Sequence, residues 1–151
     1  MDVVIGLLIW IHFLALAAGG AAAFGMPVVG SRMPTATAET RPTLFAIMKG
    51  ISTVGRAAIG TLVVTGPLIV WLKYGGFGTM PIWFWVKMVL VLLAGLNFLL
   101  FIFKVEPSLL RLGPHDATPM FAKAVGVASL VFWFGVLTYG RLLPYLGTGG
   151  G

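Results

Sequence analysis

The sequence predicts an all-α integral membrane protein, a four-helix bundle, and three observations support this fold class. Hydrophobic residues make up 59% of the 151 residues and charged residues only 9%, whereas a soluble domain has about 25% charged residues. The mean hydropathy is +1.03. The apolar residues gather in four runs, each near the roughly 20 residues that a helix needs to cross a bilayer. No polar stretch is long enough for a soluble domain, so we expect residues 1–151 to form one domain.

The first predicted span covers about residues 3–25. Only Asp2 precedes it, so it lacks the basic start of a secretory signal peptide, and we interpret it as a retained helix. Ala15, Gly19 and Ala23 recur in it at a spacing of four, which lets helix backbones approach closely. We expect this face to pack inside the bundle; a homodimer contact is the alternative.

The other three spans follow in order. The second covers about residues 57–72, with an amphipathic lead-in from residue 44, the third about 82–103, and the fourth about 124–145. Proline, glycine or charged residues bound each span and indicate where a helix ends. These boundaries are Met26-Pro27, Lys73–Gly76, Met80-Pro81, Lys104–Pro107 and Pro144.

Lysine and arginine gather on the two loops that share one side of the membrane. These loops and their approaches carry Arg32, Arg41, Lys49, Arg56, Lys104, Arg111 and Lys123. The opposite side has Lys73 and Arg141, with Lys87 just inside the third span. Because such residues favour the cytoplasmic side, we expect both termini outside, across the inner membrane if the protein is bacterial. Aromatic residues near the outer ends agree with an interfacial belt: Trp71, Tyr74, Trp83, Trp85, Tyr139 and Tyr145.

Composition also excludes several function classes. The net charge of +6 is explained by basic loops near anionic headgroups, and no basic run with interleaved aromatics indicates nucleic acid. Cysteine is absent, which excludes disulfides, thiolate ligands and covalent haem attachment. Carboxylate pairs, a glycine-rich phosphate loop and a nucleophile triad are missing as well, so the catalytic residues are unknown.

His12 is the most informative residue, because it is the one ionisable group inside the first span. Burying such a group in hydrocarbon costs roughly 2.5 kcal/mol or more unless it is paired, so it marks a candidate functional site. Neutral imidazole is a ligand for metals and for haem iron. A histidine that only hydrogen-bonds to another helix is the alternative, and sequence alone leaves both open.

Lys87 lies five residues into the third span and therefore in the same half of the membrane as His12. Its side chain either reaches the outer headgroups or faces inward toward an anionic group. An inward Lys87 would suit a ligand carboxylate such as a haem propionate. Arg141, at the outer end of the fourth span, is either an anchor or a second partner for a propionate.

Three further polar residues have simpler interpretations. His115 belongs to an inner loop, too far from His12 to share one metal, and we interpret it as solvated. Arg56 is expected to reach the inner headgroups. Asn97, in the middle of the third span, needs a partner in lipid, and we expect a hydrogen bond to another helix.

The pattern resembles one family of small membrane proteins. The residues that carry the resemblance are Trp10-Ile-His12-Phe-Leu-Ala, Gly60-Thr-Leu-Val-Val-Thr-Gly66 and Trp83-Phe-Trp-Val-Lys87-Met-Val-Leu. They are similar to the superfamily of HemJ-type protoporphyrinogen oxidases and CopD-type copper-resistance proteins. In the HemJ type, a helix-one histidine and a helix-three lysine are the signature polar residues and haem b is bound. His12 and Lys87 match those positions.

The resemblance implies a haem-b-binding membrane redox protein, a HemJ-like oxidoreductase acting on a porphyrin or a quinone. His12 would be the metal ligand, and Lys87 and Arg141 would help to bind the cofactor. The sequence departs from the HemJ pattern after Gly19 and at Asn97, where a histidine is expected. The alternatives are a non-catalytic accessory or assembly subunit, in a homodimer or a larger membrane complex, and a CopD-like copper-handling protein. The methionines are scattered and the sequence has no histidine-rich cluster, so copper handling is the least favoured of these functions.

Overall fold

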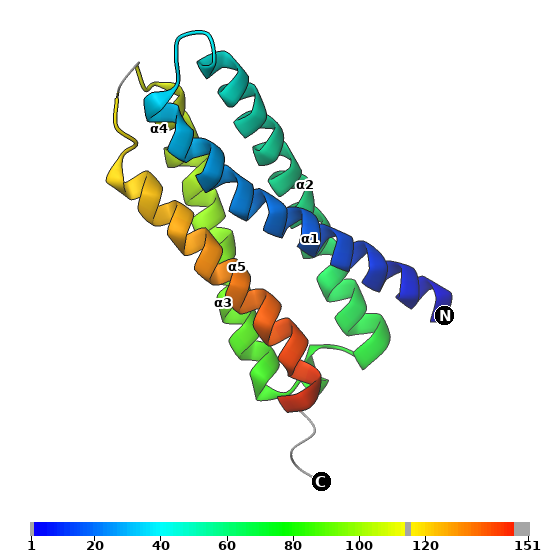
Figure 1. The fold of residues 1–151 in the computed structure, drawn as a ribbon. Helices are drawn as coiled ribbons and strands as arrows, with labels where there is room; N and C mark the ends of the chain where they lie inside the picture. Colours follow the sequence, from blue (N-terminus) through cyan, green and yellow to red (C-terminus); the bar gives the residue numbers. More distant parts are fainter. Residues whose placement is uncertain (1, 114–115, 147–151) are drawn as a thin grey trace.

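The computed structural model describes residues 2–113 and 116–146, and every regular element in these ranges is helical (Figure 1). The elements are α1 (Asp2–Arg32), η1 (Met33–Thr35), α2 (Arg41–Tyr74), η2 (Phe77–Thr79), α3 (Ile82–Leu100), η3 (Phe101–Val105), α4 (Glu106–Leu110) and α5 (Met120–Leu146). Four helical segments in the described chain are long and apolar enough to cross a membrane: Asp2–Thr35, Arg41–Tyr74, Ile82–Leu110 and Met120–Leu142. The predicted all-α four-helix fold is confirmed.

The first helix extends beyond the predicted boundary at Met26-Pro27. Pro27 lies inside α1, which continues to Arg32. A proline removes one backbone N–H and crowds one carbonyl, but a long membrane helix accommodates this because neighbouring turns and helices compensate. The boundary prediction was therefore wrong at this proline.

The second predicted span and its lead-in form one continuous helix. α2 has 34 residues and contains Pro67 in its interior. It ends at Gly75, whose φ of 78° lies in the left-handed region that glycine adopts at no steric cost. The backbone N–H of Gly75 donates to the carbonyl of Val70, which caps the last turn.

The third span does not end at Lys104–Pro107 either. η3 is a π-helical turn that links α3 to the short helix α4, so the helical segment runs on to Leu110. A π turn holds more residues than an α turn and changes which face of the helix follows it. Val105, the last residue of this turn, and Leu109 of α4 are both buried, at 2% and 4% exposure.

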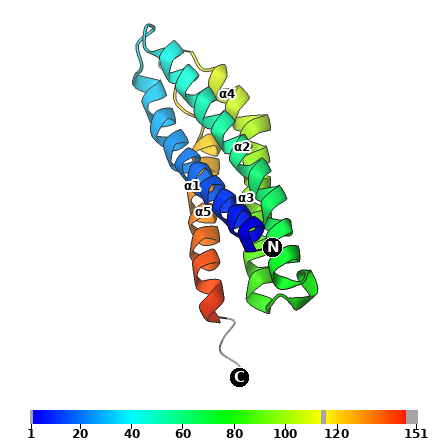
Figure 2. The same ribbon diagram turned by 90° about the vertical axis from the view of Figure 1, so that its right-hand side faces the viewer.

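The helices pack as two pairs. α1 packs along α2, α3 packs along α5, and α1 also contacts α5. Figures 1 and 2 show the start of α1 and the end of α5 toward one end of the bundle, here called the termini end. The opposite end is here called the loop end. There, α1 and α4 finish, and α2 and α5 begin. A core cluster lies at the loop end: Met33, Met48, Val105, Leu109 and Ala122.

Candidate functional site

His12 makes one interhelical hydrogen bond near the termini end of the bundle. Its Nδ1 lies 2.8 Å from the Oγ1 of Thr65 on α2. Thr65 is only 5% exposed, whereas His12 is half-buried. The imidazole also lies close to the α2 backbone, since a Cβ added at Gly66 would stand 3.6 Å from His12 Cε1. His12 therefore faces α2, at a point where the helix presents a glycine.

The hydroxyl of Thr65 determines which ring nitrogen carries the proton. Thr65 Oγ1 lies 2.7 Å from the carbonyl oxygen of Thr61, to which it donates its one hydrogen. The oxygen of Thr65 is then left to accept, so we assign the proton of neutral His12 to Nδ1. Nε2 keeps its lone pair in this tautomer. This is the arrangement in which a histidine binds a metal through one nitrogen while the other is held by a neighbouring acceptor.

Lys87 points between helices and not toward the headgroups. A Cβ added at Gly140 of α5 would stand 3.6 Å from Lys87 Nζ, so the ammonium group lies against α5. Among the described residues the side chain of Lys87 has no ion-pair partner. Of the two orientations that the sequence left open, the structure has the inward one.

Arg141, the third predicted cofactor-binding residue, contacts an aromatic ring of its own helix. Arg141 is exposed, and its guanidinium stands 5.3 Å from the centre of the Tyr145 ring, a cation–π contact within α5. His115 falls outside the described residues. Within the described parts of the chain, no group of three or more histidine, cysteine, aspartate or glutamate side chains could hold a metal ion. An axial haem ligand needs only one such residue.

Asn97 has the interhelical partners that were predicted for it. Its Nδ2 donates to the carbonyl of Val125 at 3.1 Å and to Ser129 Oγ at 2.7 Å, both on α5. The side chain is 7% exposed. The amide thus joins α3 to α5 and is a structural contact. The small residues of α1 also pack inside the bundle, as expected, because Ala15 and Gly19 are buried.

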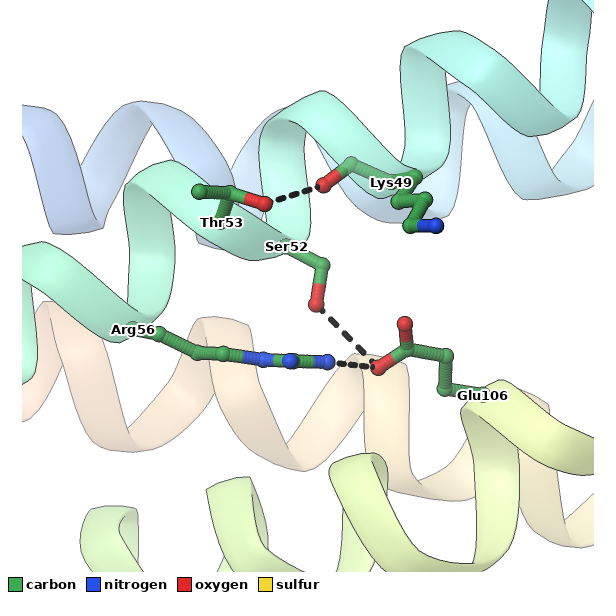
Figure 3. Close-up of polar contacts among 5 residues, drawn as sticks. All are labelled: Lys49, Ser52, Thr53, Arg56 and Glu106. Atoms are coloured by element: carbon green, nitrogen blue, oxygen red, sulfur yellow. Dashed lines mark hydrogen bonds and ion pairs between the residues drawn. The ribbon is translucent and has the colours of Figure 1, made fainter.

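Arg56 has a different role from the one predicted. It does not extend to headgroups but forms an ion pair with Glu106 of α4, as Figure 3 shows. Ser52 donates a hydrogen bond to the same carboxylate oxygen of Glu106 at 3.2 Å. In the same view, the hydroxyl of Thr53 donates to the backbone carbonyl of Lys49. The sequence prediction missed this pair because it treated Lys104–Pro107 as a boundary. The π turn of η3 carries Glu106 onward in a helix that faces α2.

Sequence reasoning also missed Thr65 and Trp133. Thr65 stands in the Gly60–Gly66 run that carries the resemblance, but nothing in its spacing identified it as the partner of His12. Trp133 is 8% exposed and packs against α1, where a Cβ added at Gly19 would come within 2.5 Å of its ring. Its burial distinguishes it from the exposed belt residues Trp71 and Trp85.

Comparisons of the chain with family models, with curated proteins and with solved structures give no match.

Proposed function

We propose that this protein binds haem b in the membrane, with Nε2 of His12 as an axial ligand to the iron. The observation that carries the proposal is the chain of contacts from His12 to Thr65 to the carbonyl of Thr61. It leaves Nε2 unprotonated and fixes the ring against α2.

Lys87 would hold a propionate of the same haem. It is a half-buried cation that lies against α5 without an ion-pair partner among the residues described. A partly desolvated charge without a counter-ion is costly, and a carboxylate ligand would reduce that cost through a charge-assisted hydrogen bond. Arg141 is another cation near the termini end, although a propionate there would compete with its contact to Tyr145.

A bound haem would supply one-electron redox chemistry, and the chain's own residues would bind and orient it. The chain has four carboxylates in all, and Asp2 is the one on the helix that carries His12. We favour an oxidoreductase of the HemJ type, in which a lipid-soluble porphyrinogen would give up electrons or a quinone would accept them. We also propose that the termini end faces outward, because the basic residues concentrate at the loop end.

The proposal is tested by the visible spectrum of the full chain, purified from cells supplied with excess haem. Wild-type protein should show a Soret band, and His12→Ala should lose it. His115→Ala should keep it. Thr65→Val should weaken haem retention by about 10- to 100-fold, since it removes the acceptor that orients the imidazole. Thr61→Val, one turn earlier on α2, is the matched control and should retain haem, because its carbonyl is unchanged.

Two outcomes would contradict the proposal in different ways. Loss of the band in His115→Ala but not in His12→Ala would mean that haem binds through another ligand. Complete absence of a Soret band from correctly folded wild-type protein would exclude haem and favour the non-catalytic accessory or assembly subunit.

A further inference from the structure

Two glycines of the bundle each lie against one side chain of the candidate site. Gly66 of α2 faces His12 of α1, and Gly140 of α5 faces Lys87 of α3. At every other glycine of α1, α2, α3 and α5, an added Cβ would meet a side chain that does not ionise, or open space. Within these four helices, glycine therefore contacts an ionisable side chain only at the candidate site.

At Gly66, the contact bears on both nitrogens of the imidazole. A Cβ added there would stand 3.6 Å from His12 Cε1, which is ordinary contact, so an alanine would fit. Valine fills two of the three staggered positions beyond its Cβ and is stiff in a helix, so we expect it to press on the ring. Cε1 is bonded to both ring nitrogens. Displacing it would therefore move Nδ1 away from the hydroxyl of Thr65 and turn Nε2 at the same time.

At Gly140, the contact involves the end of the lysine side chain. An added Cβ would stand 3.6 Å from Lys87 Nζ and 3.7 Å from Cε, so the last two heavy atoms of the side chain lie over this glycine. Lys87 is in the second turn of α3, from which a long aliphatic side chain can also extend toward the headgroups. A larger residue at position 140 would favour this outward orientation, because it would occupy the place of the ammonium group.

The backbone of the two helices gives no reason for glycine at these positions. Gly66 lies inside α2 and Gly140 inside α5, and neither has a positive φ. Inside a helix, glycine is less stable than alanine because it has more conformational freedom to lose. The reason for glycine is therefore to be sought in the side chains that pack against it.

We propose that Gly66 and Gly140 are positioning residues of the candidate site, which keep His12 and Lys87 directed between the helices. Gly66 sets the orientation of Nε2, and Gly140 holds the ammonium group inward and away from the headgroups. The inference rests on the proposed function for the ligand that these two groups would bind. The positions of the two side chains, however, can be measured on protein that contains no haem.

The role of Gly66 is tested by ¹⁵N NMR of the haem-free full chain with labelled histidine, and His115→Ala identifies the signals of His12. Wild-type His12 should have a protonated Nδ1 and an unprotonated Nε2, and Gly66→Ala should keep this tautomer. Gly66→Val should lose it and give a mixture of both tautomers. Gly55→Val is the matched control, because Gly55 also lies on α2 against α1, with Ala22 Cβ 3.5 Å from an added Cβ. It should keep the tautomer.

The role of Gly140 is tested by acylation of the haem-free protein in detergent with a water-soluble amine reagent, measured at Lys87 by mass spectrometry. Gly140→Val should raise the rate at Lys87 severalfold, because the amine moves outward, and Gly140→Ala should stay near the wild-type rate. Gly135→Val is the matched control on α5, since an added Cβ there would stand 3.4 Å from Leu90 of α3 and not near Lys87. It should leave the rate unchanged. Elution volume and helical circular dichroism establish that each variant is folded.

The outcomes separate this inference from haem binding. An unchanged tautomer in Gly66→Val, or an unchanged rate in Gly140→Val, overturns the role of that glycine. An equal change in the matched control also overturns it, because general loosening of the helix pair would then be the cause. Protein that gives the expected NMR and acylation results but never shows a Soret band contradicts the haem proposal and supports the positioning role.

Discussion

The two ends of the bundle differ in how they accommodate polar groups. Near the termini end, His12 bonds to Thr65, and the half-buried Lys87 lacks an ion-pair partner among the described residues. Toward the loop end, Arg56 pairs with Glu106 across two helices, whereas Arg41, at 7% exposure, keeps its Nε and one Nη without a hydrogen-bond partner. The loop end also holds an apolar cavity between the helices. Each end thus contains a cation whose donors the described residues do not fully satisfy, and the loop end differs by the empty volume between its helices.

The difference also separates two kinds of free-energy cost. Lys87 carries a desolvation cost that a bound anion would reduce. The cavity carries a packing cost, because atoms that line an empty space lose dispersion contacts. The two costs have different physical origins. We therefore expect substitutions in the two halves to act independently, since distant sites without shared partners have additive effects.

The largest effect expected is all-or-none and concerns which side of the membrane each end faces. A reporter that is active only in the periplasm, fused after Gly147, should be active, because the termini end is proposed to face outward. The same reporter inserted near Thr37 should be silent, because the basic loop belongs in the cytoplasm. The reverse pattern would place His12 in the cytoplasmic half and would break the proposed assignment of the two halves.

The next largest effect is expected where Gly19 of α1 contacts Trp133 of α5, between the two halves of the bundle. A Cβ added at Gly19 would lie 2.5 Å from Cη2 of the buried Trp133 ring. Gly19→Val should therefore destabilise the bundle by about 1–3 kcal/mol, measured from the thermal unfolding midpoint in detergent. Gly6→Val is the matched control in the same helix, where an added Cβ meets nothing within 4 Å. Equal midpoints for the two variants would mean that α1 and α5 are not in close contact here.

The smallest effect is expected at the ion pair. Arg56 and Glu106 have side chains that are 48% and 21% exposed, so solvent screens their attraction. Glu106→Gln should cost about 0.2–1 kcal/mol at low salt and less at high salt, while keeping an acceptor for Ser52. Lys49→Gln removes a nearby charge as a control and should be neutral. A loss above 2 kcal/mol from Glu106→Gln would show that the pair is a central element of the loop half.

Sequence reasoning recovered the fold because a membrane helix is specified by one local quantity, the length of an apolar run. It also identified His12, Lys87 and Asn97, because a polar residue in such a run is conspicuous. It failed at the helix ends, since Pro27 and Pro107 were interpreted as breakers and the structure carries helix through both.

The cavity and the role of Trp133 could not be predicted in the same way. A cavity is defined by which small residues from different helices face one another, and this depends on helix rotation. The sequence showed glycine at positions 30, 55 and 126, but it did not show that all three line one space. Thr65 illustrates the same limit, because its position opposite His12 is a property of the α1–α2 contact.

The π turn at η3 bears on how the length of this chain can change over evolutionary time. A π turn is equivalent to an α-helix with one inserted residue, so deleting one residue between Phe101 and Val105 would restore a regular helix. That deletion would rotate α4 by about 100° relative to α3 and turn Glu106 away from α2. Related chains that lack this residue are then expected to lack the acidic partner of Arg56 as well, so that the two changes are inherited together.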